Sequence, residues 1–122
     1  MRTIGIIAGG PSATVEDAQK LREICDYVIA VNDSWRLCDV DAIYGSDYRW
    51  WKWAIGDIVR DFDGDLFTQR IGWTEEPEAW GIECFEGQHK DGLCTDPGKV
   101  NCGSNSTYAA TNVALHLGAE RI

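Results

Sequence analysis

Four short polar stretches of this chain carry residue types that can bind phosphate groups and ribose hydroxyls. They are Gly9-Gly10-Pro11-Ser12, Asn32-Asp33, Ser46-Asp47, and Ser104-Asn105-Ser106 with Tyr108. Glycine turns and helix N-termini present backbone N–H groups to anions, and carboxylates can accept a proton or bind Mg²⁺. Asp47 is the first candidate for a general base or metal ligand, and Asp33 is the second. The four stretches together predict a site for a nucleotide or nucleotide-activated small molecule, which could bring Mg²⁺ as its cofactor.

The first polar stretch follows an apolar run at residues 3–8, which is typical of a strand buried in a parallel sheet. A helix is predicted to begin near Val15, with Ser12 or Thr14 as its N-cap. A strand, a glycine turn and a helix N-terminus in this order form an anion site. The spacing matches neither the GxGxxG dinucleotide motif nor the GxxxxGK[ST] phosphate loop. A tight turn without a ligand is therefore the alternative interpretation.

The second and third polar stretches follow predicted strands at residues 27–31 and 41–45. If these strands are parallel neighbours of the first, all three polar stretches lie at the same edge of the sheet, where α/β proteins bind ligands. Asn32 and Asp33 would then meet a base or ribose hydroxyls. The alternative is that Asn32 and Asp33 form only an Asx turn.

A helix is predicted from Asp47, its N-cap, to about Arg60. Trp50, Trp51 and Trp53 cannot share one narrow helix face, because neighbouring helical residues point about a hundred degrees apart. At least one of them is expected to face a cleft or a partner. Stacking on a nucleobase and packing in the core are the two interpretations.

A fourth strand is predicted at residues 66–71, and residues 72–103 are rich in loop-forming residues. A segment of this length and composition indicates an insertion, a lid or an edge hairpin, the last built around residues 81–85. His89 lies in this segment. It is either a catalytic acid or base or a solvated surface residue.

Small hydroxyl and amide residues at 103–107 precede an alanine-rich helix that is expected to end at Gly118. Ser104, Asn105 and Ser106 would form a second anion site at its N-terminus, and a capped helix without a ligand is the alternative. Residues 120–122 stand where another strand should begin. Either the chain is truncated there or a terminal strand is missing from the core.

The composition fits one globular domain, since the chain has 122 residues of which 44% are hydrophobic and 25% charged. A net charge of −9 argues against binding to a nucleic-acid backbone. The sequence has neither a membrane-span pattern nor a signal-peptide pattern, so a cytoplasmic protein without a membrane partner is expected.

The five cysteines are odd in number and have no CxxC spacing, which favours free thiols over a disulfide framework. A zinc site could be drawn from Cys84, Cys94, Cys102 and His89. Their spacings of ten and eight residues, without a paired knuckle, argue against it.

The four polar stretches, with Leu117-Gly118-Ala119-Glu120-Arg121-Ile122 after the last helix, resemble a family of small, mostly uncharacterised phage and prophage proteins with a Rossmann-like domain. That domain is distantly similar to pterin diphosphokinases, motility-accessory glycosyltransferases and the sialyltransferases that use CMP-sialic acid. The resemblance spans nearly the whole chain. It is specific for the phage family and loose for the enzymes.

The resemblance implies that Gly10, Pro11 and Ser12 meet the nucleotide phosphates and that Asn32 meets the ribose or base. It also implies that Ser104, Asn105 and Ser106 close on the phosphates from the second helix.

The sequence departs from these relatives in several places. Gly9 stands where the sialyltransferases have Asn, and their catalytic His has no counterpart. Thr107 stands where family members usually have Gly. Family members also continue past Ile122 with a strand and a Gly-Tyr-Asp turn. The resemblance therefore supports nucleotide binding better than any named reaction.

We therefore expect a three-layer α/β Rossmann-like domain spanning residues 1–122, with a mostly parallel sheet that lacks its C-terminal strand. The expected function is that of a glycosyl- or phospho-transferase that binds its nucleotide at the carboxyl ends of the strands. The expected binding residues are Gly9, Gly10, Pro11, Ser12, Asn32, Ser104, Asn105, Ser106 and Tyr108.

Two alternatives remain at this point. One is a non-catalytic phage accessory protein that sequesters a nucleotide-derived metabolite. The other is a module that docks a protein partner through exposed tryptophans, Trp51 among them. The absent strand also allows a homo-oligomer that completes its sheet from a neighbour.

Overall fold

The computed structural model describes residues 2–9, 13–103 and 105–122, in which six strands form one parallel sheet in the order β1-β2-β3-β4-β5-β6. The strands are β1 (Ile4–Ala8), β2 (Tyr27–Val31), β3 (Ala42–Tyr44), β4 (Asp65–Gln69), β5 (Glu83–Gln88) and β6 (Lys99–Asn101). The helices are α1 (Val15–Ile24), α2 (Tyr48–Asp61) and α3 (Ser106–His116), with short 3₁₀ helices η1 (Asn32–Arg36) and η2 (Pro77–Trp80).

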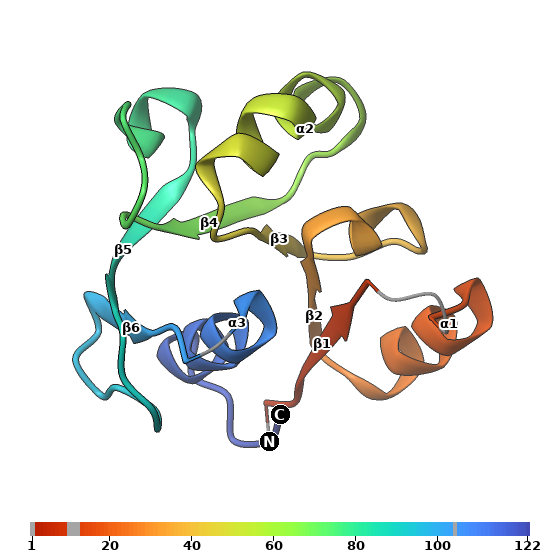
Figure 1. Cartoon of the computed structure of the whole chain (residues 1–122). Coiled ribbons are helices and arrows are strands. Elements are labelled where there is room, and N and C mark those ends of the chain that lie inside the picture. Colours follow the sequence, from red (N-terminus) through yellow and green to blue (C-terminus); the bar gives the residue numbers. More distant parts are fainter. Residues whose placement is uncertain (1, 10–12, 104) are drawn as a thin grey trace.

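Helices cover both faces of the sheet. The sheet curves around α3, while α1 and α2 lie on its outer face (Figure 1). Successive side chains of a strand point to opposite faces of the sheet, so each face carries its own hydrophobic cluster. One cluster packs Ile4, Ile29 and Val31 against the alanines of α3, and the other contains Ile7 with Ala18 of α1. The structure therefore confirms the expected three-layer α/β architecture.

The parallel sheet is larger than the sequence predicts. Residues 72–103, expected to be a loop-rich insertion or lid, contribute η2, β5 and β6, with loops between them. Residues 81–85, named above as the possible centre of an edge hairpin, overlap the start of β5 at Glu83–Gln88. This strand is paired in parallel with both β4 and β6, so the segment is not an edge hairpin.

The predicted helix after Asp47 is confirmed as α2, and the Asp47 carboxylate accepts a hydrogen bond from the Arg49 amide at 2.8 Å. Trp51 is fully buried, and its indole N–H donates to the carbonyl oxygen of Gly45 at 2.9 Å. Trp53 on the same helix is 68% exposed. The expectation that Trp51 docks a partner is therefore wrong, because its whole surface packs inside the protein.

After β6 the chain crosses the concave face of the sheet as α3 and returns to the outer edge of β1. There Arg121 forms a parallel bridge with Thr3, and the Ile4 amide donates to the carbonyl oxygen of Arg121 at 2.9 Å. This return reverses the direction in which the chain winds across the sheet. Open α/β sheets bind ligands outside the carboxyl ends of the strands beside such a reversal.

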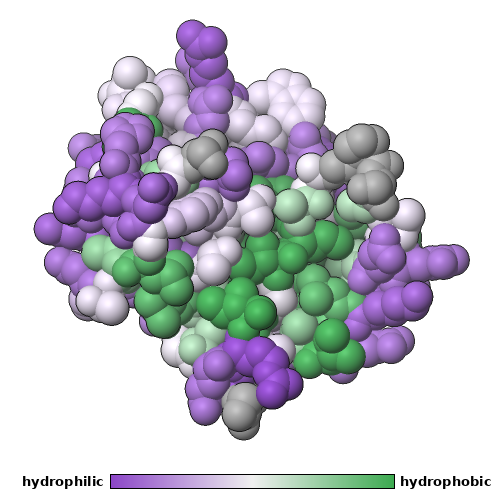
Figure 2. Space-filling view, turned by 60° about the horizontal axis from the view of Figure 1, so that its bottom comes forward, coloured by the Kyte–Doolittle hydropathy of each residue, from purple (hydrophilic) through white to green (hydrophobic). Residues whose placement is uncertain are grey.

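Beyond Arg121, the outer edge of β1 borders an apolar groove of about 370 Å³. Ile24 of α1 and Ile122 line it, with 75% and 51% of their surfaces exposed. Figure 2 shows apolar side chains gathered on this face of the molecule.

Candidate functional site

Two adjoining pockets lie over the carboxyl ends of the strands. The β1/β2 pocket, of about 660 Å³, lies beyond the ends of those two strands. The β3–β6 pocket, of about 240 Å³, lies beyond the ends of the other four. Asn105 and Ser106 line both, so the pockets form one strand-end groove across the N-terminus of α3.

The β1/β2 pocket brings together residues from three separate parts of the chain. Its lining residues are Ala8, Gly9, Val31, Asn32, Asp33, Asn105, Ser106 and Thr107. Five of the predicted site residues therefore share one cavity: Gly9, Asn32, Asp33, Asn105 and Ser106. Its volume is within the range of about 300–1,000 Å³ that is usual for small-molecule sites.

Asn32 has an unusual backbone conformation where β2 ends. Its φ of 52° is in the left-handed region, the only such value for a non-glycine residue in the described part of the chain. Asparagine tolerates this region better than most residues, but the conformation still costs about 1 kcal/mol or more. Strained backbone of this kind is often found at ligand sites, where it directs a side chain.

Asp33 is an exposed carboxylate in the same pocket. The indole N–H of Trp50 donates to Asp33 Oδ1 at 3.2 Å, which holds the carboxylate in place from α2. The Trp50 ring also packs edge-on against Trp51, with ring centroids 4.9 Å apart. No nucleobase-stacking geometry is needed to explain its position.

The N-terminus of α3 forms the opposite wall of the pocket. The side chain of Asn105 caps the helix by accepting a hydrogen bond from the Tyr108 amide at 2.9 Å. The next amides along the chain, those of Ser106 and Thr107, occupy first-turn positions that have no partner within a helix. They are therefore suited to binding an anion.

Two further predicted site residues, Asp47 and Tyr108, lie outside both pockets. Asp47 lines neither pocket, and its carboxylate is engaged as the α2 cap. Tyr108 packs its ring over Gly103, and its hydroxyl accepts a hydrogen bond from the Gly92 amide, so it supports the turn before α3. Four other predicted site residues, Gly10, Pro11, Ser12 and Ser104, lie outside the described part of the chain.

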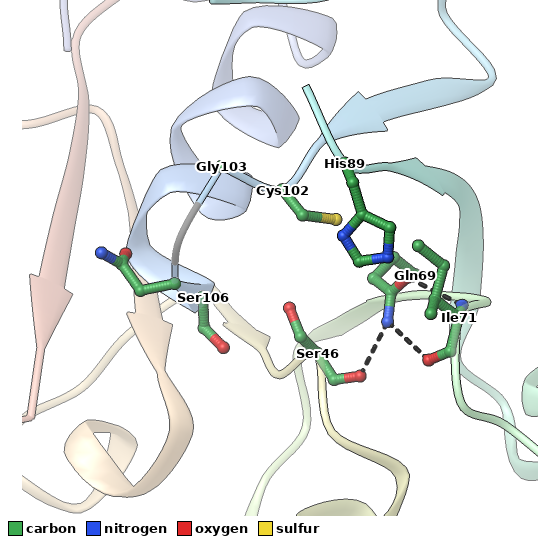
Figure 3. A pocket seen from close by; sticks show the side chains of 8 residues that line it. Ser46, Gln69, Ile71, His89, Cys102, Gly103 and Ser106 are labelled. Atoms are coloured by element: carbon green, nitrogen blue, oxygen red, sulfur yellow. Dashed lines mark hydrogen bonds between the residues drawn. The ribbon is translucent and has the colours of Figure 1, made fainter. Parts of the chain in front are cut away.

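The β3–β6 pocket is lined by Ser46, Gln69, His89 and Cys102, and each lies at or just beyond the end of a different strand (Figure 3). Ser46 belongs to the third polar stretch of the predicted site, whereas nothing in the sequence pointed to Gln69. His89 was only a loop candidate in the sequence, because the strands on either side of it were not predicted. The pairing of β5 with β6 is what places it over the groove.

Gln69 holds the floor of this pocket. Its side chain is nearly buried and donates to the carbonyl oxygens of Ser46 at 3.0 Å and Ile71 at 2.9 Å. Its oxygen accepts from the Ile71 amide at 2.7 Å. These three bonds commit Gln69 to structure and join the segments that follow β3 and β4.

Burial raises the pKa of the Cys102 thiol above its ordinary value. The thiol is therefore neutral near pH 7 and is not an activated nucleophile. All five cysteines are free thiols.

Among the described residues that line the two pockets, none is Lys or Arg, and Asp33 alone carries a formal charge. An anion in the groove would be held by backbone N–H groups and hydroxyls. Within the same described ranges, no three His, Cys, Asp or Glu side chains come together in a way that could hold a metal ion. The drawn zinc group of Cys84, Cys94, Cys102 and His89 is thus not assembled.

Comparison with known proteins finds no family model, no curated protein and no solved structure that matches this chain. None of the helices in the described ranges is long and apolar enough to cross a membrane.

Proposed function

We propose that the strand-end groove binds a nucleotide or a nucleotide-activated small molecule, and that the protein transfers a glycosyl or phosphoryl group from it. The single observation that carries the proposal is the β1/β2 pocket. It joins Gly9 at the end of β1, an Asn-Asp pair and a helix N-terminus in one cavity. Backbone amides at the helix would hold a phosphate, and Asp33 would accept hydrogen bonds from ribose hydroxyls.

The charge of the β1/β2 pocket restricts the class of ligand that it can bind. Asp33 is negative, no Lys or Arg is among the described lining residues, and the chain carries a net charge of −9. A ligand with few negative charges is therefore favoured over a triphosphate, which would need Mg²⁺ to offset its charge. Nucleoside monophosphates and nucleotide sugars are the classes that fit best.

A second candidate function is binding without turnover, in which the protein sequesters such a ligand. The position of Asp47 favours it, because the carboxylate expected to act as a base caps α2 and lines neither pocket. Mass spectrometry of bound ligand after incubation distinguishes the two functions. Unchanged ligand supports sequestration, and a transferred group supports the transferase.

A thermal-unfolding screen against nucleotides and nucleotide sugars, with and without Mg²⁺, tests the proposal. A ligand at a hundred times its Kd adds about 2.7 kcal/mol of stability. Asp33→Asn keeps the shape of the side chain but removes its charge. It should weaken binding about tenfold, since hydrogen bonds to charged groups contribute about 1.5–3 kcal/mol.

Asp63→Asn is the matched control, because Asp63 is exposed and lies between α2 and β4 rather than in the groove. This control should bind like the wild type. The proposal fails if no nucleotide stabilises the folded protein, or if both variants change binding equally.

A further inference from the structure

We propose that the β3–β6 pocket is a second ligand site, for an uncharged group bearing a hydroxyl, and that His89 accepts a hydrogen bond from that hydroxyl. In a transferase this would be the site of the acceptor, a role that rests on the proposed function. Binding itself can be tested without a nucleotide.

The pocket has walls from four strand ends. Ser46 follows β3, Gln69 ends β4, His89 follows β5 and Cys102 follows β6. Figure 3 shows the His89 ring and the Cys102 sulfur directed into the pocket, with the Ser46 side chain on the opposite wall. A volume of about 240 Å³ suits a small group rather than a whole nucleotide.

The lining indicates an uncharged ligand. Among the described residues of this pocket there is no Asp, Glu, Lys or Arg to offset the charge of a ligand. Both N–H groups of Gln69 are already used in bonds to Ser46 and Ile71, and its oxygen accepts from the Ile71 amide. Burial keeps the Cys102 thiol neutral by raising its pKa. Hydroxyls and the imidazole ring therefore supply the polar contacts.

The two histidines of the chain have different surroundings. His116 Nε2 lies 2.6 Å from the carbonyl oxygen of Lys99 and 3.2 Å from Asn112 Nδ2, and its ring stacks on Phe85. His89 is exposed and borders the cavity. A neutral imidazole has one nitrogen that accepts a hydrogen bond, so His89 can bind a hydroxyl while His116 is committed to the fold.

The β3–β6 pocket adjoins the proposed phosphate site, so the hydroxyl of a bound ligand could act as the acceptor in a transfer reaction. Asn105 and Ser106 line both pockets, so a group held by His89 lies next to the helix N-terminus where we place the phosphate. Another polar atom on this side is the Ser46 hydroxyl, which lies 2.8 Å from the Tyr44 hydroxyl. An acceptor and an activated donor could thus lie side by side in one groove.

The test is an NMR titration of the ring signals of His89 and His116 with methyl glucoside, glycerol and ribitol, and with glucuronate as an anionic control. We expect at least one neutral compound to shift the His89 signal saturably while the His116 signal stays in place. Glucuronate should bind more weakly than methyl glucoside. His89→Gln, followed by the backbone amide signals of Cys102 and Gly103, should weaken binding about two- to tenfold, as the loss of one neutral hydrogen bond does.

The inference is overturned if none of the neutral compounds shifts the His89 signal, if glucuronate binds as well as methyl glucoside, or if His89→Gln binds with unchanged affinity. Failure of the proposed function gives a different result. In that case nucleotides leave the amide signals of Gly9 and Asn32 unmoved, whatever the neutral compounds do at His89.

Discussion

The hydroxyl oxygen of Ser34 lies 2.7 Å from the carbonyl oxygen of Ile7, so that one buried side chain on η1 ties the chain after β2 to the end of β1. The same hydroxyl lies 2.8 Å from the carbonyl oxygen of Val31. These contacts lie directly behind the β1/β2 pocket. They fix the end of β1 relative to Asn32 and Asp33.

Ser34→Ala is therefore expected to lower the free energy of unfolding by about 1–2 kcal/mol, because buried carbonyl oxygens lose a hydrogen-bond donor. Urea denaturation measures this loss. Thr74→Ala, at an exposed position, is the control and should stay within about 0.5 kcal/mol of the wild type. A Ser34 variant as stable as this control would show that the Ser34 hydroxyl does not stabilise the fold.

The left-handed backbone of Asn32 makes a prediction that separates conformation from side-chain chemistry. Asn32→Ala should destabilise the protein by about 1 kcal/mol relative to Asn32→Gly, since glycine adopts a φ of 52° without steric cost. Thermal unfolding of the two variants measures the difference. Equal stabilities would contradict the left-handed conformation. Both variants lose the side-chain amide, so both should weaken nucleotide binding.

The buried side chain of Asn112 fastens the loop between β5 and β6 to α3. Its oxygen accepts hydrogen bonds from the amides of Cys94 and Asn101, each at 2.9 Å, and its nitrogen donates to the carbonyl oxygen of Cys94 at 3.0 Å.

Asn112→Leu is similar in shape but leaves these three backbone groups without a partner, at a cost of about 2–4 kcal/mol. Hydrogen exchange should report faster exchange of the Cys94 amide. Asn105→Ala, which removes a helix cap on the same helix, should cost only about 1 kcal/mol and leave the Cys94 amide protected. Slow exchange at Cys94 in the Asn112 variant would contradict the anchoring role.

Stability should fall at alkaline pH through Cys84. Burial is the main cause that raises the pKa of this thiol from 9.0 to about 11, against the opposing effect of Arg70. The folded protein therefore keeps the thiol protonated where the unfolded chain ionises it. The stabilisation is fully present below pH 9 and is lost as the pH rises toward 11.

Urea unfolding of the wild type and of Cys84→Ala from pH 8 to 11 tests this prediction. The variant should lose less stability over that range, because it lacks the titrating thiol. Parallel curves for the two proteins would mean that Cys84 titrates alike in the folded and unfolded states.

The first half of the fold could be predicted because its signals are local. The apolar runs of β1 and β2, and the Asp47 cap of α2, each depend on residues adjacent in sequence. The later strands could not, because the six residues of β5 include only two that are strongly apolar, Cys84 and Phe85, which are adjacent, and β6 has only three residues. Both are strands because their neighbours pair with them, which no local pattern records.

The same reason limits the prediction of the site. Asn32 and Asp33 could be located because they follow a recognisable strand, but His89 and Gln69 meet only after β4, β5 and β6 are aligned. Trp51 could not be assigned from composition, because burial of a helix face depends on what packs against it. Asp47 shows a further limit, since a residue suited to catalysis is equally suited to capping a helix.

The bridge between Thr3 and Arg121 brings the two ends of the chain together, with the Glu120 amide 2.9 Å from the carbonyl oxygen of Arg2 (Figure 1). Residues 2–3 and residues 120–121 thus lie side by side. A circular permutant, in which a short glycine-serine linker joins the ends and new ends open in a surface loop, would need little rearrangement of the fold. Such a gene design would place β1 and the segment around Arg121 in one continuous stretch of chain.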